Sequence, residues 1–328
     1  MNRRGFLQRG IVSAAAAAPA VRSGVAVGQA PWPAKPVKLV VPFAPGGGSD
    51  IIARLLAPKF VEILKQPLLI DNRPGASGIV GADAVVKSAA DGYTLLLSNN
   101  ASLATAPQVY GNKSYHPLTD FAHIVMIGAF ANALLVRADH PANTIQEFLA
   151  RIKREPGKFT FASAGPGSAG HLTGELLKSR AAIDMQHVPY KGAGPAIVDL
   201  LAGHIDAVFD GLPASIGYIR SGKLRMLAIS SAQRSPLFPA VPTLAEVIPD
   251  VIGTAWFGLS APARTPPAVV ATLQQVVQRM LAMPDLQARY REMGVDIATR
   301  GAADYTAFVE TEIARWTPVI RAASVKAN

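Results

Sequence analysis

The chain has 328 residues, of which 50% are hydrophobic and 16% charged, so it can form two domains with sizeable cores and is not a disordered chain. It contains no cysteine, which excludes disulfide bonds, a catalytic thiol, thiolate metal sites and the cysteine that anchors a lipoprotein. The formal net charge is +10, but the basic residues are scattered without a long run, so we expect no nucleic-acid partner.

The first thirty residues have the pattern of a Tat-type signal peptide. A twin-arginine pair, Arg3-Arg4, precedes the apolar run Ile11–Ala20, which is too short for the ~20 residues that span a bilayer. The small residues of Gly28-Gln29-Ala30 fit a signal peptidase, so we expect residues 1–30 to be removed and the mature protein to be soluble and periplasmic. Two alternatives stay open: cleavage after Ala20, and an alanine-rich helix of a cytosolic protein.

Beyond this region, short apolar segments alternate with longer amphipathic ones. The pattern first predicts strands at 37–43, 68–71 and 93–98, with helices between them. A turn at Gly46-Gly47-Gly48 leads into the first helix, where Ser49 and Asp50 stand at the expected N-cap. Pro58 is expected to kink or shorten that helix. Repeated strand, turn and helix indicate βαβ units and a mostly parallel sheet.

The middle of the chain begins with a longer apolar run, 124–136, which predicts a strand that crosses from one lobe to another. The alternation then restarts, with strands predicted at 159–162, 185–190, 205–209 and 224–230, and helices at 144–154, from 168, at 195–202 and at 213–219. A proline-rich connection at 236–249 leads to a candidate return crossing at 255–259. Two helices, near 267–283 and 305–320, close the chain.

This order predicts an α/β fold of two lobes with two hinge crossings. Residues 31–127 and 252–328 would build lobe one, and residues 128–251 would form lobe two, inserted between them.

Loops of small residues stand at the carboxyl ends of predicted strands in both lobes. Lobe one has 42–50, 74–78 and 98–102, and lobe two has 163–168. Such loops let backbone N–H groups and helix dipoles approach an anion. Four or five charge-assisted hydrogen bonds, each contributing ~1.5–3 kcal/mol, could sustain micromolar binding, about −8 kcal/mol, after the costs of ordering. The alternative for any single loop is an ordinary strand-to-helix turn.

Enzyme and cofactor motifs are incomplete. The serine-hydrolase pattern Gly-x-Ser-x-Gly fails at Ser168, because Pro166 replaces its first glycine. Gly46-x-Gly48 is followed by Ile51, which breaks the dinucleotide pattern, and there is no phosphate-binding P-loop. The six histidines are dispersed. We therefore expect no enzymatic activity, no cofactor and no metal, and we interpret Lys191 as a solvated or lobe-bridging residue.

Several motifs resemble those of the Bug family, the periplasmic solute receptors of tripartite tricarboxylate transporters. The matching stretches cover nearly the whole chain after the signal region: 41–47 through Asp50, 71–76 with Gly78 and Gly81, 91–96, Tyr115 with Pro117 and 120–121, 188–192, 195–196, 199–201 with Gly203, and 242–244.

The resemblance implies a Venus-flytrap periplasmic-binding-protein fold, in which loops of both lobes grip a ligand carboxylate as a pincer, partly through waters. Carried over position by position, it nominates as ligand-binding residues Phe43, Ala44, Pro45, Gly47, Ser49 and Asp50 in lobe one and Ser163, Ala164, Gly165, Ser168 and His171 in lobe two. Ser98, Asn99 and Asp210 would face the variable end of the ligand, and Asp50 is expected mainly to cap its helix.

The implied function is capture of a small organic or amino acid by a monomeric receptor that delivers it to a membrane permease. A sensor that feeds a signalling receptor and, less favoured, an exported hydrolase are the alternatives. The sequence leaves the identity of the carboxylate open.

Overall fold

A computed structural model describes residues 32–111 and 114–322, which form one compact unit. The predicted signal peptide and its cleavage site lie outside the described residues. The strands are β1 (Val37–Val41), β2 (Leu68–Asn72), β3 (Thr94–Asn99), β4 (Phe121–Arg137), β5 (Thr160–Ser163), β6 (Gln186–Pro189), β7 (Ala207–Gly211), β8 (Leu224–Ile229), β9 (Thr254–Pro262) and β10 (Val295–Arg300).

Helices follow most strands. They are α1 (Gly48–Leu64), α2 (Ile79–Val86), α3 (Ala106–Val109), α4 (Ile145–Arg154), α5 (Ala169–Ala181), α6 (Ala193–Ala202), α7 (Leu212–Arg220), α8 (Leu244–Val247), α9 (Pro267–Leu281), α10 (Pro284–Glu292) and α11 (Ala302–Ala322), with single turns η1 (Ala76–Gly78) and η2 (Ala101–Thr105). No helix in the described part of the chain combines the length and the apolar character needed to cross a membrane.

The strands form two lobes that share β4. In the first lobe, β1 pairs in parallel with β2 and β3, and β9 pairs antiparallel with β3 and β4, while β10 pairs antiparallel with β4. In the second lobe, β5 pairs in parallel with β6 and β7, whereas β7 and β8 pair antiparallel with β4. The partners of β4 change between Ala131 and Asn132. The prediction of lobe boundaries at 127/128 and 251/252 stays a prediction.

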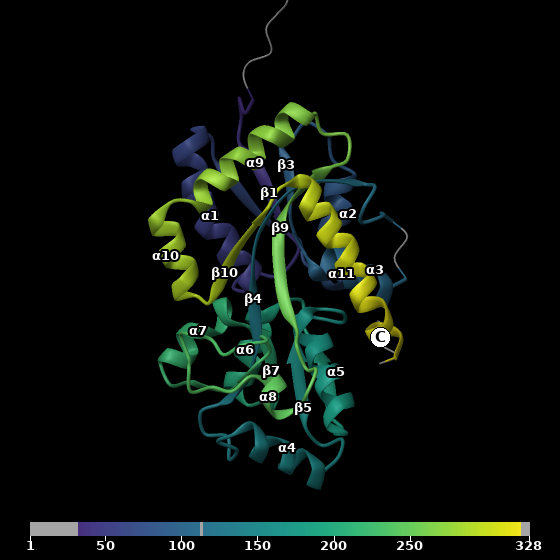
Figure 1. Cartoon of the computed structure of the whole chain (residues 1–328), viewed down its shortest axis with the longest axis vertical. Coiled ribbons are helices and arrows are strands. Elements are labelled where there is room, and N and C mark those ends of the chain that lie inside the picture. The colour runs from purple at the N-terminus through teal and green to yellow at the C-terminus, as the bar shows by residue number, and fades with distance from the viewer. Residues whose placement is uncertain (1–31, 112–113, 323–328) are drawn as a thin grey trace, which may run out of the picture. The chain divides into compact units, whose positions relative to one another are not determined.

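Side chains of each central strand alternate between two cores, because helices cover both faces of each lobe. In β1, Leu39 packs on the core that α1, α9 and α10 cover, and Val40 packs on the core that α2 and α11 cover. In β4, Leu134 and Leu135 enter the two cores of the second lobe in the same way. Figure 1 shows α1 and α10 on one side of the first-lobe strands and α2 and α11 on the other.

Three local predictions were wrong. The sheet is mixed, since both crossing strands, β4 and β9, run antiparallel to their neighbours. The N-cap of α1 is Gly47, so Ser49 and Asp50 lie in its first turn. Pro58 lies inside α1 without shortening it, and the kink expected there stays a prediction. Finally, α10 and β10 lie between the two closing helices that the sequence predicts.

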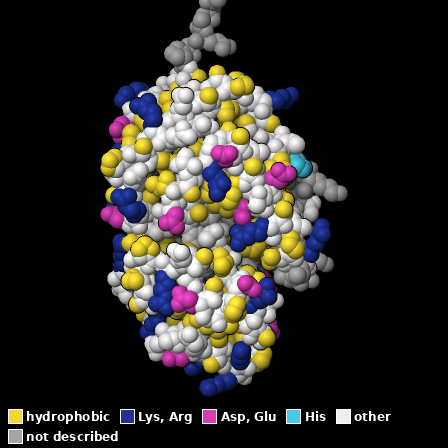
Figure 2. Space-filling model, in the orientation of Figure 1, with side chains coloured by type: hydrophobic (Ala, Val, Ile, Leu, Met, Phe, Trp, Pro, Cys, Tyr) yellow, Lys and Arg dark blue, Asp and Glu magenta, His cyan; other side chains and the backbone are white. Residues whose placement is uncertain are grey.

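Basic and acidic side chains are interspersed over the surface. Figure 2 shows Lys and Arg side chains alternating with Asp and Glu on the face in view. Ion pairs such as Lys59–Asp285, at 2.6 Å, join neighbouring helices on this surface.

Candidate functional site

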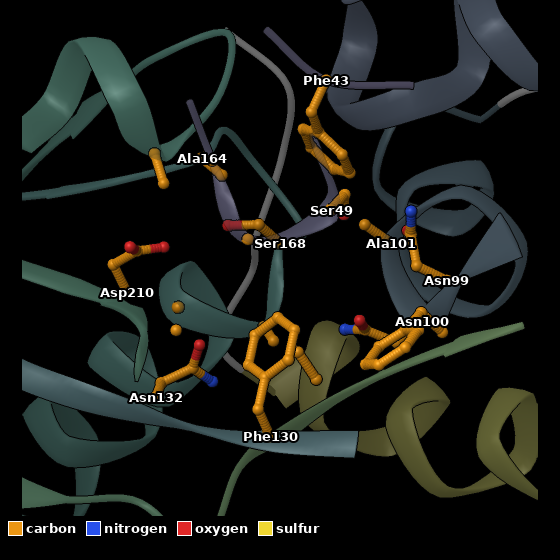
Figure 3. A pocket seen from close by; sticks show the side chains of 18 of the residues that line it. Phe43, Ser49, Asn99, Asn100, Ala101, Phe130, Asn132, Ala164, Ser168 and Asp210 are labelled. Carbon is orange, nitrogen blue, oxygen red and sulfur yellow. The ribbon is translucent and has the colours of Figure 1, made fainter. Parts of the chain in front are cut away.

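A cavity of about 570 Å³, counting the part open to solvent, lies between the two lobes (Figure 3). Its wall is built from both lobes and from the crossing strands β4 and β9. The lining residues are Phe43, Gly47, Gly48, Ser49, Asn99, Asn100, Ala101, Phe130, Asn132, Ala164, Ser168, Ala169, Gly170, Ala193, Phe209, Asp210, Gly211, Ala255, Trp256 and Phe257.

Helix N-termini from opposite lobes open onto this cavity. The first lobe contributes the start of α1, at Gly47–Ser49, and the second contributes the start of α5, at Ser168–Gly170. The starts of α6 and α7, at Ala193 and Gly211, also line it. Unpaired N–H groups and the positive end of the helix dipole make each start favourable for an anion. Four of them around one cavity create a site for negative charge without a basic side chain.

The loop before α1 is held by a buried carboxylate. Asp50, 3% exposed, accepts hydrogen bonds from the Gly46 backbone N–H at 3.0 Å, from Arg54 Nε at 2.8 Å and from Asn72 Nδ2 at 3.0 Å. Asn72 Nδ2 also donates to the Phe43 carbonyl oxygen. Burial raises the pKa of Asp50, but the hydrogen bonds from Arg54, Gly46 and Asn72 outweigh it and hold the pKa below its usual value. Asp50 therefore positions the loop as an ionised group.

The facing loop, Ser163–Gly167, is held by two stacked histidines. Ser163 Oγ lies 2.7 Å from His187 Nε2, and the Gly167 backbone N–H donates to His171 Nδ1 at 2.9 Å. The two imidazole rings stack with centroids 3.8 Å apart. Burial, with a smaller contribution from the charge of Lys178, lowers the pKa of His171 to about 4. Burial, with smaller contributions from His171 and then Lys178, lowers the pKa of His187 to about 3. Both rings are thus neutral at pH 7, as the Gly167 bond requires.

An aromatic ring forms part of the cavity wall between the lobes. A Cβ at Gly48 would lie 3.0 Å from Phe130 Cζ, and a Cβ at Gly211 would lie 2.2 Å from Phe130 Cε2. The ring therefore fits only because glycine begins α1 on one side and precedes α7 on the other. Phe130 belongs to β4, the strand that both lobes share.

Two buried polar atoms in the wall have no hydrogen-bond partner among the described residues. These are Asp210 Oδ2, at the end of β7, and Asn100 Nδ2, after β3. Figure 3 shows the two side chains on either side of Phe130, with their polar ends turned toward the space between them. Burial raises the pKa of Asp210 to about 7, against a smaller lowering by the Gly211 backbone N–H. Among the described residues that line the cavity, Asp210 is the only ionisable one.

The lobes contact each other at the rim of the cavity. The Ala44 backbone N–H donates to the Lys191 carbonyl oxygen at 3.1 Å, and Thr105 Oγ1 donates to the Gly167 carbonyl oxygen. Gly194, in the first turn of α6, lies so close to the loop before α1 that a Cβ there would be 2.7 Å from the Pro45 carbonyl oxygen. This arrangement is a closed one. Lys191 bridges the lobes through its backbone.

The structure brings only some of the nominated residues into the wall. Those that line the cavity are Phe43, Gly47, Ser49, Asn99, Ala164, Ser168 and Asp210. Those that lie outside its lining are Ala44, Pro45, Asp50, Ser98, Ser163, Gly165 and His171. Ser98 is fully buried behind the wall, where its hydroxyl bonds Ser260 Oγ and Tyr305 OH.

The lining residues that sequence reasoning missed fall into two groups. Some, such as Gly48 and Gly170, are neighbours of nominated residues, and a prediction that took in the first helical turn after each loop would have included them. Others, such as Phe130 and Trp256, come from the crossing strands. The signal for these was present, because a strand that crosses between two lobes has to pass the cleft.

Comparison with known proteins places the chain in a family. The model of the tripartite tricarboxylate transporter family receptor, TctC, matches residues 52–325. The chain belongs to this family. Protein BugT of Bordetella pertussis is 38% identical to it over 297 residues, which cover 90% of this chain and 91% of BugT. The resemblance to the Bug receptors is thereby confirmed.

Two solved structures of receptors of this type are similar over most of the chain. The R. palustris protein Rpa4515 with adipate has a TM-score of 0.88 and 35% identity, covering 90% of this chain and 100% of that one. MatC (Rpa3494) from Rhodopseudomonas palustris with bound malate has a TM-score of 0.84 and 32% identity, covering 88% and 100%. These similarities confirm the α/β, two-lobed periplasmic-binding-protein fold.

Proposed function

We propose that this chain captures a small carboxylate in the cavity between its lobes and presents it to the permease of a tripartite tricarboxylate-type transporter. The observation that carries this proposal is the convergence of the α1 and α5 starts, one from each lobe, on one cavity. The adipate and malate in the two related structures support a carboxylate as the ligand.

The nominated residues take different roles in this proposal. Gly47 and Ser49 on one side, with Ala164 and Ser168 on the other, form the carboxylate pincer, and Phe43, Asn99 and Asp210 contact the rest of the ligand. Asp50, Ser163 and His171 hold the two loops, as their hydrogen bonds suggest. Ala44, Pro45 and Gly165 act where the lobes meet, and Ser98 acts from behind the wall through Tyr305.

The cellular setting belongs to the same proposal. Residues 1–30 act as a Tat-type signal peptide, and the mature chain works in the periplasm as a monomer. It binds its ligand without chemical turnover, since the family to which it belongs consists of receptors.

Ligand titration of residues 31–328 tests the proposal. Calorimetry with a panel of mono- and dicarboxylates is expected to give micromolar binding by at least one of them, and a hundredfold excess over its Kd is expected to stabilise the fold by about 2.7 kcal/mol. Absence of a signal with every acid would contradict the carboxylate proposal.

A charge placed at the pincer provides a sharper test. Ser49→Asp puts an acid in the first turn of α1, where it suits the helix dipole but repels a bound carboxylate, so affinity is expected to fall about tenfold or more while the fold stays intact. Gln146→Asp is the matched control, because it puts the same charge at the same position of α4, on an exposed surface away from the cavity. Equal affinities of the two variants would show that the α1 start does not contact the anion.

A further inference from the structure

The cavity wall holds one acceptor and one donor that the protein leaves unpaired. Asp210 is 8% exposed and Asn100 is 3% exposed, and Asp210 Oδ2 and Asn100 Nδ2 have no partner among the described residues. Unpaired buried polar atoms are rare, because each costs about 1–3 kcal/mol. Six such atoms occur in the described part of the chain, and two of them, one from each lobe, belong to residues that line this one cavity. Their shared position in a cavity points to ligand groups that pair with them.

The two atoms require opposite groups from the ligand. Asn100 Nδ2 is a donor, and it lies after β3 beside Ala101 in the wall, so it suits a ligand oxygen. Asp210 Oδ2, at the end of β7 in the other lobe, accepts a hydrogen bond when the carboxyl group is ionised. A ligand with a carboxylate at both ends would place a second negative group against the ionised form of this acceptor, and none of the described lining residues carries a positive charge to separate the two.

We propose that the ligand of this cleft carries, besides its carboxylate, a hydrogen-bond donor directed at Asp210 Oδ2, and that a protonated amine is the preferred donor. The inference rests on the proposed function, since it assumes that the carboxylate is held by the helix starts. An ammonium group supplies both the missing hydrogen bond and the missing positive charge, whereas a hydroxyl group supplies the hydrogen bond alone. Asp210 is then the specificity-determining residue of the site.

The electrostatics of Asp210 support the same assignment. Burial raises its pKa to about 7, so the ionised carboxylate is costly in this wall without a cation. A ligand ammonium within hydrogen-bond distance would stabilise the ionised form in the way that a salt-bridge partner does. The aromatic residues Phe43, Phe130 and Phe209 in the same wall would pack against the carbon skeleton between the two charged ends.

Matched ligand sets test the proposal on the unaltered mature chain. One set compares 6-aminohexanoate, 6-hydroxyhexanoate, hexanoate and adipate, and a second compares L-glutamate, 2-hydroxyglutarate and glutarate, so that the donor is placed both at the far end and beside the carboxylate. In at least one set the amine is expected to bind about 10- to 100-fold more tightly than the acid without a donor, with the hydroxy acid in between. If the hydroxy acid bound more tightly than the amine, the hydrogen-bond donor on the ligand would be supported but the preference for an amine would be contradicted. Binding by the acids without a donor that equals or exceeds binding by the amine in both sets would overturn the proposal.

Replacing the Asp210 carboxylate with a neutral group tests whether Asp210 causes the preference for an amine. Asp210→Asn keeps the size of the side chain but removes its charge, so the preference for the amine is expected to shrink to less than about threefold. Asp250→Asn is the matched control, because this exposed carboxylate belongs to the same lobe and asparagine tolerates its positive φ of 66°. An unchanged preference in Asp210→Asn would overturn the assignment. Failure of all the acids to bind the unaltered chain would instead contradict the proposed function.

Discussion

At the scale of single residues, the neutral pair His171–His187 makes the stability of the folded chain depend on pH. The pKa of His187 falls from 6.5 to about 3 on folding and that of His171 to about 4, chiefly because burial disfavours the charged ring. The unfolded chain therefore binds more protons than the folded one below about pH 6.5. Stability that is complete above this pH is lost as the pH falls toward the folded pKa values.

His187→Gln is expected to flatten this dependence. Glutamine does not take up a proton, so the free energy of unfolding should fall less steeply between pH 7 and pH 5, by up to about 1.4 kcal/mol per pH unit relative to the unaltered chain. Urea unfolding at several pH values measures both slopes. If the free energy of unfolding had the same slope against pH in both chains, His187 would not be held in its neutral form in the folded protein.

The residues of the pincer were predictable one by one, whereas for the rest of the wall the sequence indicated only the crossing strands and not which of their residues face the cavity. Gly47, Ser49 and Ser168 follow from one local rule, that glycine and serine loops after strands begin helices and bind anions. The aromatic wall depends on register instead, because Phe130 reaches the cavity only where Asn132 of β4 pairs with Gly211 of β7. No local pattern encodes that pairing, since the two residues are 79 positions apart.

At the scale of elements, the start of α1 lacks a side-chain N-cap, and Asp50 replaces it from inside the helix. Its carboxylate joins the Gly46 N–H, Arg54 and Asn72, so one first-turn acid fixes a loop, a helix and the end of β2. The sequence predicted that Asp50 would cap its helix, but the carboxylate instead accepts from Gly46, before the helix, and from Asn72 of β2.

Asp50→Ala is expected to lower both stability and affinity. The change leaves Asn72 Nδ2 and the Gly46 N–H without their acceptor and should cost about 2–3 kcal/mol, measured by urea unfolding. Affinity for the best acid of the panel should fall with it, because the loop that begins α1 loses its anchor. Asp285→Ala is the control: this acid also begins a helix and pairs with Lys59, but it is exposed and should change little. Similar losses in both variants would contradict the anchoring role of Asp50.

The elements that sequence reasoning missed had recognisable boundaries. Pro284 occupies the first turn of α10, Asp285 follows it, and Arg289 and Arg291 lie in its last turn, which is the usual order of charges in a helix. Gly294, with a φ of 70°, then turns the chain into β10. The strand itself is short and pairs only at one edge of β4, so its alternation is too weak to stand out.

At the scale of the whole described molecule, the two lobes were predictable but their contact was not. The restart of the strand–helix alternation after 124–136 indicated a second lobe, and β4 follows that segment closely. The contact between the lobes uses backbone groups on at least one side, as in the bonds from Ala44 to Lys191 and from Thr105 to Gly167, and backbone groups leave no pattern in the sequence of side chains. The structure adds points where a side chain would oppose closure, and Gly194 is one of them.

Gly194→Ala is expected to weaken ligand binding without weakening the fold. The new Cβ would lie 2.7 Å from the Pro45 carbonyl oxygen of the other lobe, so the closed arrangement must open slightly, at a cost of about 1–3 kcal/mol, or about tenfold in affinity. Because Gly194 lies in α6 with an ordinary φ, alanine should hold or raise the stability of the unliganded chain.

Gly217→Ala provides the control, since Gly217 lies in α7 of the same lobe with no atom near its Cβ position. Calorimetry with the best acid of the panel compares the two affinities, and small-angle scattering compares how far each variant contracts when that acid is added. A Gly194→Ala variant that binds and contracts like Gly217→Ala would contradict the inference that this rim contact forms in the liganded state. A loss confined to Gly194→Ala would tie affinity to a backbone contact on the rim of the cavity, and would make lobe closure a part of ligand binding.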